Sequence, residues 1–245
     1  MADTIDDVAR LEENLRSVRD RIAAAARSAG RDPASVALLA VSKTWPADDV
    51  RALAVLGQRD FGENRAQELT AKAAELADLA GPAATAVRWH FVGQLQRNKA
   101  AAVARLGAVV HSVDRTSLAG ALDRVGQEQG RPVEVFLQVD LGGRPAGAAP
   151  RGGAAPDEVP ALAEAVAAAP GLRLRGLMAV APRDEEARPA FERLAALADR
   201  VRADHPEAVE LSAGMSGDLE DAIAAGATIV RVGTALFGDR PLVSG

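Results

Sequence analysis

The sequence contains no cysteine and no tyrosine, and only three of its 245 residues are lysines. The absence of cysteine excludes thiolate catalysis, cysteine-ligated zinc and disulfide bonds. The absence of tyrosine removes every acid–base mechanism that depends on a phenol. The three lysines are therefore the complete set of candidates for Schiff-base chemistry, and they are Lys43, Lys72 and Lys99.

Long apolar runs and strong charge imbalance are also missing. No run approaches the length of a membrane span, and the N-terminal residues are too polar and acidic for a secretory signal. The net charge of −5 is spread along the chain, unlike the basic footprint of a nucleic-acid-binding protein. We therefore expect a cytoplasmic protein with neither a membrane nor a nucleic-acid partner, and with no metal site.

An amphipathic helix is expected over the first thirty residues, because its apolar residues recur at steps of three and four. They are Val8, Leu11, Leu15, Val18 and Ile22. Gly30 and Pro33 end this helix. The stripe extends over only about two heptads, which favours packing against the same domain over a coiled coil.

After this helix, short apolar runs alternate with alanine- and leucine-rich segments of helical spacing, such as 47–56, 66–79 and 189–201. Such alternation predicts parallel strands joined by right-handed crossovers. Strands are expected over residues 36–41, 59–61, 88–92, 108–112, 133–139, 174–180, 209–211 and 228–232. Eight strands can close a TIM barrel, so we expect one α/β domain, a (β/α)8 barrel over residues 1–245 with an extra N-terminal helix. A doubly wound open sheet is the alternative.

Two connections, 79–87 and 142–156, are rich in glycine, proline and alanine. The second holds five glycines and three prolines and follows an expected strand. Because the alternation of strands and helices resumes after it, we interpret it as a long loop at the functional face rather than an interdomain linker.

Lys43 ends an inward-facing series at the first expected strand. Within VALLAVSKT (36–44), Leu39, Val41 and Lys43 share one face by the period-two rule. Burial at the barrel mouth would disfavour the ammonium form and make the amine a Schiff-base nucleophile. A surface lysine just past a strand end explains this segment equally well. Lys72 has acidic neighbours on a helix and is expected to be solvated, and Lys99 is the second candidate.

Serines, glycines and a threonine follow the last two expected strands, where barrels often bind phosphate. LSAGMSGD (211–218) offers Ser212, Gly214, Ser216 and Gly217, and VRVGTALFG (230–238) offers Gly233 and Thr234. Each residue alone is ordinary in a turn, but the two loops together favour a phosphate site.

Arg231 lies in the last strand, just before the second of these loops. Facing inward, it would lie near a ring bound between Lys43 and the phosphate. Such a cation would disfavour protonation of a pyridine nitrogen and weaken the ring as an electron sink. The alternative is an arginine paired with a core carboxylate.

Seven motifs occur in order at regular spacing. They are AVSKT (40–44), FGENRAQE (61–68), WHFVGQLQRNK (89–99), HSVD (111–114), RGLMAVAP (175–182), LSAGMSGD (211–218) and VRVGTALFG (230–238). Through them nearly the whole chain resembles the pyridoxal phosphate homeostasis proteins (the YggS/PROSC family). These proteins are similar in fold to the N-terminal barrel of bacterial alanine racemase.

The resemblance implies that pyridoxal 5′-phosphate forms a Schiff base with Lys43 and that Asn64 lies beside it. It also implies a phosphate site and a cation at the pyridine nitrogen. The residues of these two sites are Ser212, Gly233 and Thr234 for the phosphate, with Gly214 from the same loop, and Arg231 for the nitrogen. The implied role is buffering or delivery of the cofactor to enzymes that need it, by a monomer without established turnover.

The chain departs from the family pattern at Arg65, where an aromatic residue is common, and at Ala213, where methionine is common. The loop 142–156 also lacks the usual polar residues. None of these changes removes Lys43 or the two phosphate loops.

Enzymatic activity is the main alternative to a carrier. Alanine racemases use the cofactor lysine on one face and a tyrosine from a second domain on the other, and this chain has no tyrosine. A low-activity racemase or transaminase that uses Lys43 alone, with His90 or His111 assisting, stays open, although lone buried histidines are more often structural. His205 is expected to be exposed at a helix end. A barrel that binds another phosphorylated metabolite is a third possibility.

Overall fold

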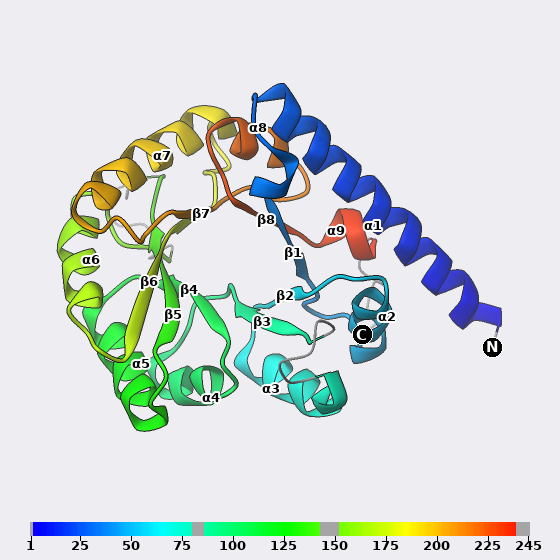
Figure 1. Cartoon of the computed structure of the whole chain (residues 1–245), viewed down its shortest axis with the longest axis horizontal. Helices are drawn as coiled ribbons and strands as arrows, with labels where there is room; N and C mark the ends of the chain where they lie inside the picture. The colour runs from blue at the N-terminus through cyan, green and yellow to red at the C-terminus, as the bar shows by residue number, and fades with distance from the viewer. Residues whose placement is uncertain (1, 80–85, 143–151, 239–245) are drawn as a thin grey trace.

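The computed structural model describes residues 2–79, 86–142 and 152–238. Within them, eight parallel strands close into a barrel in sequence order, with helices around it (Figure 1). The strands are β1 (Ala37–Val41), β2 (Asp60–Glu63), β3 (Arg88–Phe91), β4 (Val109–Val113), β5 (Val133–Val139), β6 (Leu172–Ala179), β7 (Glu210–Ser212) and β8 (Ile229–Val232). The predicted barrel is confirmed, and the open-sheet alternative is wrong.

The helices of the described residues lie outside the barrel and cover its strands (Figure 1). They are α1 (Ala2–Ser28), α2 (Ala47–Val55), α3 (Ala66–Glu75), α4 (Ala100–Arg105), α5 (Thr116–Gln129), α6 (Val159–Ala167), α7 (Ala187–Asp204), α8 (Leu219–Ala224) and α9 (Thr234–Phe237), with 3-10 turns η1 (Pro33–Ser35), η2 (Ala77–Leu79) and η3 (Arg97–Lys99). All eight expected strands are present, and their ends differ from the predicted bounds by at most two residues.

The barrel encloses a small apolar cluster that is separate from the larger core between strands and helices. Its buried members come from five strands and are Leu39, Val109, Phe136, Met178 and Ile229. Leu39 belongs to the inward series predicted for the first strand, so that face assignment is confirmed. Polar side chains carried by the strands are buried as well, and they include His90, His111, Ser212 and Arg231.

The pairing of β5 with β6 contains an irregularity that the sequence does not reveal. Val135 pairs with Leu174 and Phe136 pairs with Gly176, so Arg175 is skipped in the register. A bulge of this kind redirects one side chain. Arg175 forms ion pairs with Glu134 and Glu210 at the amino-terminal end of the barrel.

Helix α1 packs against the same chain, as predicted, and lies beside α8 and α9 (Figure 1). Four residues of its apolar stripe are buried, namely Leu11, Leu15, Val18 and Ile22, whereas Val8 is 39% exposed. Polar contacts fix it to the end of the chain that follows β8. Arg10 Nη1 donates to the carbonyl of Phe237 at 2.8 Å, and Asn14 Nδ2 donates to that of Leu236 at 2.9 Å.

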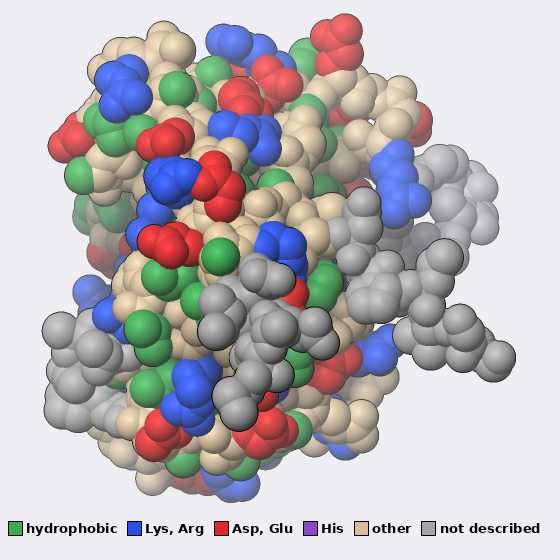
Figure 2. Space-filling view, turned by 90° about the vertical axis from the view of Figure 1, so that its right-hand side faces the viewer, with side chains coloured by type: hydrophobic (Ala, Val, Ile, Leu, Met, Phe, Trp, Pro, Cys, Tyr) green, Lys and Arg blue, Asp and Glu red, His purple; other side chains and the backbone are tan. Residues whose placement is uncertain are grey.

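The glycine-rich connection 142–156 lies mostly outside the described residues, as does most of 79–87. Of the part that is described, Ala154 forms an isolated parallel bridge with Val139, the last residue of β5. Acidic and basic side chains are interspersed on the face seen in Figure 2. Among the described residues, no helix is both long and apolar enough to cross a membrane.

Candidate functional site

A cavity of about 450 Å³ opens at the carboxyl-terminal mouth of the barrel. Its lining comes from the segments that follow β1, β2, β7 and β8, with further walls from β5 and β6. Among the predicted residues, the lining contains Lys43, Asn64, Ser216, Gly217, Arg231, Gly233 and Thr234. The volume lies within the range that small-molecule sites usually have.

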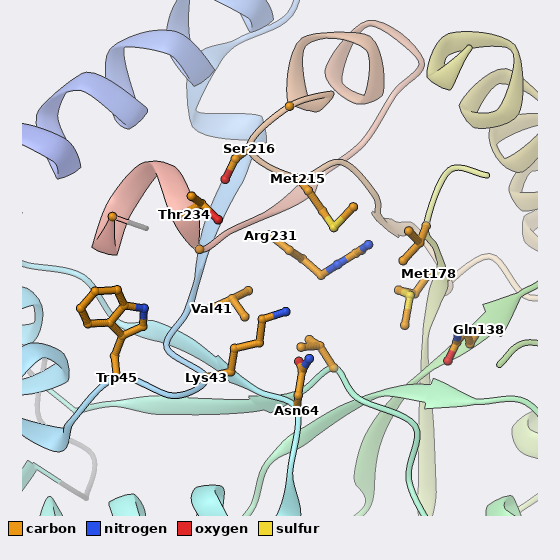
Figure 3. A pocket seen from close by; sticks show the side chains of 15 residues that line it. Val41, Lys43, Trp45, Asn64, Gln138, Met178, Met215, Ser216, Arg231 and Thr234 are labelled. Atoms are coloured by element: carbon orange, nitrogen blue, oxygen red, sulfur yellow. The ribbon is translucent and has the colours of Figure 1, made fainter. Parts of the chain in front are cut away.

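Lys43 enters this cavity two residues after the end of β1. Its side chain projects from the floor of the site past Val41 toward Arg231 (Figure 3). Of the three lysines in the chain, only Lys43 lines the cavity. The next residue, Thr44, has a φ of 70°, a conformation that a β-branched residue rarely adopts. Its amide donates to Oε2 of Glu68 at 3.1 Å, so a helix α3 carboxylate supports a strained turn directly after the lysine.

Lys72 is not solvated as predicted, and this expectation was wrong. Its ammonium group is buried, lies 2.5 Å from Oε1 of Glu63 and donates to the carbonyl of Ser42 at 2.7 Å. The hydroxyl of Ser42 donates to the same carboxylate oxygen at 2.7 Å. Burial is the largest influence on Glu63 and raises its pKa. The ion pair of Lys72 and Glu63 therefore holds Ser42, the residue before Lys43, in place through two hydrogen bonds.

Asn64 follows β2 and lines the cavity beneath Lys43 (Figure 3). The loop after β3 presses against its backbone at Gly93. A Cβ at Gly93 would lie 2.1 Å from the carbonyl oxygen of Asn64, so only glycine fits there. Arg65, where the family pattern has an aromatic residue, has a side chain that is 76% exposed and pairs with Glu68.

The loops after β7 and β8 meet at the opposite wall of the cavity. Ser216, Gly217, Gly233 and Thr234 all line it, and Figure 3 shows Ser216 and Thr234 side by side. The two loops are joined where the amide of Ala235 donates to Oγ of Ser216 at 3.3 Å. Hydroxyls and backbone amides therefore converge on one part of the wall, a donor set that suits a phosphate.

Ser212 and Gly214 lie outside this lining. Ser212 is fully buried, and its hydroxyl is within hydrogen-bond distance of both His111 and Arg231. Gly214 has a φ of 89°, and a Cβ there would lie 2.6 Å from the Cβ of Ala222. Its carbonyl accepts from the amide of Arg231 at 2.9 Å. These two residues shape the turn that brings Ser216 to the cavity.

Arg231 is buried inside the barrel, and its guanidinium forms one wall of the cavity (Figure 3). Nη1 donates to the carbonyl oxygen of Ser212 at 2.6 Å and to its Oγ at 3.0 Å, and Nη2 donates to the carbonyl of Ala179 at 2.8 Å. Burial lowers the pKa of Arg231 to about 10, so it remains a cation at neutral pH. The hydrogen bonds of its guanidinium thus go to Ser212 and Ala179, and among the described residues no carboxylate forms an ion pair with it.

Several residues that line the cavity were not predicted from the sequence. Trp45 lines it and stacks on Phe237, with ring centroids 5.8 Å apart. Gln138 and Met178 line it from β5 and β6. The signal for Gln138 was present, because it lies two residues after the inward-facing Phe136. For Trp45, which follows a strained turn, the sequence carried no such signal.

The histidines lie away from the cavity lining. His90 and His111 are buried in the barrel interior and hydrogen-bonded to each other at 2.8 Å. His205 was expected to be exposed, but it is only 9% exposed and lies 3.7 Å from Glu164. Lys99, the second lysine candidate, belongs to η3 and does not line the cavity. Within the described residues, no group of histidine and acidic side chains could hold a metal ion.

Comparison with known proteins agrees with this geometry. The family model for the alanine racemase N-terminal domain matches residues 7–241. A pyridoxal phosphate homeostasis protein of Pseudomonas aeruginosa is 47% identical over 230 residues, covering 94% of this chain and 96% of that protein. A protein of the same name from Escherichia coli K12 is 41% identical over 234 residues, covering 94% and 97%.

Solved structures give the same grouping. PipY of Synechococcus elongatus, solved with pyridoxal phosphate bound, superposes with a TM-score of 0.79 at 38% identity, covering 93% of this chain and all of that one. Alanine racemase of Corynebacterium glutamicum, at 18% identity and a TM-score of 0.68, shares the fold, and this chain spans 63% of it. The chain belongs to the alanine racemase N-terminal domain family and, within it, to the pyridoxal phosphate homeostasis proteins.

Proposed function

We propose that this protein binds pyridoxal 5′-phosphate through a Schiff base with Lys43 and serves in homeostasis of that cofactor. The observation that carries the proposal is the position of Lys43, which faces a buried arginine across a cavity with a phosphate-type wall. The relatives named as pyridoxal phosphate homeostasis proteins, and the cofactor bound in PipY, support it. We also propose that residues 1–245 act as a single domain in the cytoplasm.

The residues of the cavity fit this cofactor. Ser216, Gly217, Gly233 and Thr234 offer hydroxyls and closely approachable amides for the phosphate. We propose Ser216 as the serine that contacts it, with Ser212 acting from behind through Arg231. When bound, the cofactor supplies an aldehyde that condenses with an amine and a ring that can delocalise electrons.

Arg231 limits the ability of the cofactor ring to delocalise electrons. A guanidinium donates hydrogen bonds and accepts none, so a pyridine nitrogen beside it stays unprotonated. The unprotonated ring is a weak electron sink. Arg231 therefore favours holding the cofactor over amino-acid chemistry on it.

The composition of the cavity lining also favours holding the cofactor over amino-acid chemistry. Its described residues include no aspartate, glutamate or histidine, and the chain has no tyrosine. Lys43 is thus the one described lining residue whose side chain carries an amine that could serve as a general base. A two-base racemase needs a second proton-transferring side chain on the other face of its substrate, and the described lining offers none. We propose that the protein is a carrier, not an enzyme, and that it acts as a monomer in brief contact with enzymes that receive the cofactor.

Transfer to a second protein tests this role. The loaded protein is mixed with an enzyme stripped of pyridoxal phosphate, and the recovery of enzyme activity is followed over time. A carrier restores that activity while its own visible absorbance falls. If the loaded protein instead converts added amino acids in many turnovers and restores nothing, it is a low-activity racemase or transaminase.

A further inference from the structure

A line of polar side chains runs through the barrel interior, from the cofactor cavity toward the amino-terminal mouth. Arg231 Nη1 lies 3.0 Å from Oγ of Ser212, and that oxygen lies 3.0 Å from Nδ1 of His111. Nε2 of His111 lies 2.8 Å from Nδ1 of His90, whose Nε2 lies 2.9 Å from Oδ1 of Asp60. Five side chains from β8, β7, β4, β3 and β2 therefore form one continuous hydrogen-bonded chain.

The two ends of this chain of side chains fix the direction of every bond in it. Arg231 can only donate, and the carboxylate of Asp60 can only accept. Burial lowers the pKa of His90 and His111, so each is neutral and has one donor and one acceptor nitrogen. One arrangement satisfies all members: Ser212 donates to His111, His111 Nε2 donates to His90, and His90 Nε2 donates to Asp60.

The middle of the chain of side chains is shielded from water, whereas both ends reach a cavity. His111 stacks on Phe136 with ring centroids 4.3 Å apart, and both histidines are at most 3% exposed. At one end, Arg231 lines the cofactor cavity. At the other, Asp60 and His90 line a second cavity of about 220 Å³.

The charged groups around the histidines are arranged asymmetrically. His90 is faced by Asp60 and, more distantly, by Arg88 and Glu134. Among the described residues, His111 is influenced by its neighbour His90 and by the cations Arg231, Arg88 and Arg175. Positive charge near His111 and a carboxylate near His90 both favour bonds that donate toward Asp60.

We propose that these five residues form a polarised relay in which Asp60, at the far mouth of the barrel, sets the hydrogen bonds that hold Arg231 in the cofactor cavity. His90, His111 and Ser212 are positioning residues in it. Because Ser212 donates its proton to His111, its lone pairs face the guanidinium and anchor it. This inference rests on the proposed function only where it concerns the cofactor, since the relay itself belongs to the protein alone.

The test compares two carboxylates of the same mouth. Asp60 is the last residue of the relay. Glu210 lines the same amino-terminal cavity but is not a member of the relay, and it pairs with Arg175. Asp60→Asn offers His90 an amide that can donate as well as accept, so it removes the fixed direction. Glu210→Gln changes the charge of the mouth equally and leaves the relay intact, which makes it the matched control.

Imidazole nitrogen NMR of the protein without cofactor reads the tautomers of all three histidines. In the wild type, His90 and His111 are expected as Nε2–H tautomers. Asp60→Asn should move the nitrogen resonances of both residues together toward a mixture of tautomers, with those of His205 unchanged. Glu210→Gln should leave all three in place. A response confined to His90, or an equal response to Glu210→Gln, would overturn the relay.

A second readout uses pyridoxal 5′-phosphate labelled with nitrogen-15 in the ring. Asp60→Asn and Ser212→Ala should both shift the pyridine nitrogen resonance of the bound cofactor, because the anchoring of Arg231 changes, and Glu210→Gln should not. An unshifted resonance in both variants would overturn the link to the cofactor. If the wild type takes up no cofactor, the proposed function fails, while the histidine spectra still decide the relay.

Discussion

Nζ of Lys72 lies 2.5 Å from Oε1 of Glu63, in a buried ion pair directly behind the residue that precedes Lys43. The other carboxylate oxygen of Glu63 is buried without a hydrogen-bond partner. The negative charge of Glu63 is therefore stabilised by the ammonium group of Lys72 and by the hydroxyl of Ser42, which both contact Oε1. The pair couples the stability of this corner of the barrel to the placement of Lys43.

Replacing Lys72 with methionine should destabilise the fold strongly. It leaves a buried carboxylate without its cation, which typically costs about 3–5 kcal/mol. Urea denaturation followed by circular dichroism measures the loss. Replacing Glu63 with glutamine in the same chain should restore most of it, because no buried charge then remains. Lys99→Met provides the control. A Lys72→Met variant as stable as that control would show that the ion pair with Glu63 does not stabilise the fold.

Gly93→Ala should disturb the cofactor site from outside it. The added Cβ would lie 2.1 Å from the carbonyl of Asn64, so the loop that carries Asn64 must move. We expect the affinity for pyridoxal phosphate to fall at least tenfold, which is a loss of about 1.4 kcal/mol or more in binding free energy. Absorbance titration measures this affinity. Gly120→Ala is the matched control, because nothing lies within 4 Å of its Cβ and alanine favours helix α5. Equal affinities of the two variants would show that the close contact is unimportant.

Trp45 should support binding through its stack on Phe237, the last residue of α9, whose first residue Thr234 lines the cavity. Aromatic pairs contribute about 0.5–1.5 kcal/mol beyond their buried area. Trp45→Ala should therefore weaken cofactor binding by roughly two- to tenfold, and Trp45→Phe, which keeps an aromatic ring, should weaken it less. Trp89→Phe serves as the control, since that tryptophan packs against Phe61 and does not line the cavity. The stack has no such role if Trp45→Ala binds as tightly as Trp89→Phe.

The buried histidines should make stability depend on pH below neutrality. Burial lowers the pKa of His90 and His111 in the folded protein, whereas in the unfolded chain both titrate near 6.5. Below that pH the unfolded state binds protons that the folded state excludes, so the free energy of unfolding falls as pH falls. Each histidine contributes up to about 1.4 kcal/mol per pH unit.

His111→Gln isolates one of these two contributions. Urea unfolding between pH 7 and pH 5 should show a shallower loss of stability in this variant than in the wild type. Carboxyl groups such as Glu63, whose pKa burial raises, titrate in both proteins and cancel in the difference. Parallel stability curves for the two proteins would mean that His111 is not held neutral in the fold.

The inward face of the first strand and the barrel itself could be predicted because both follow from local periodicity. Leu39, Val41 and Lys43 alternate in a strand, and that pattern is independent of the rest of the chain. For Arg231 the sequence offered an inward orientation only as one of two alternatives, and the structure buries this residue inside the barrel. Eight alternations of strand and helix then left few topologies to consider.

The remaining features depend on contacts between segments distant in sequence. Lys72 looks solvated beside its acidic helical neighbours, and only the β2 residue Glu63 explains its burial. The choice between Ser212 and Ser216 depends on the turn at Gly214, where φ is positive. Likewise, the relay joins five strands, and no single segment of sequence contains more than one of its members.

Reduction of the cofactor-loaded protein with borohydride, followed by peptide mass mapping, identifies the lysine that forms the Schiff base. The chain offers only three lysines, and one of them, Lys43, lines the cavity. We expect a pyridoxyl label on the peptide that contains Lys43, and no stable label in a Lys43→Ala variant. A label on Lys99 or Lys72, or an imine absorbance that survives Lys43→Ala unchanged, would contradict the assignment of the Schiff base to Lys43.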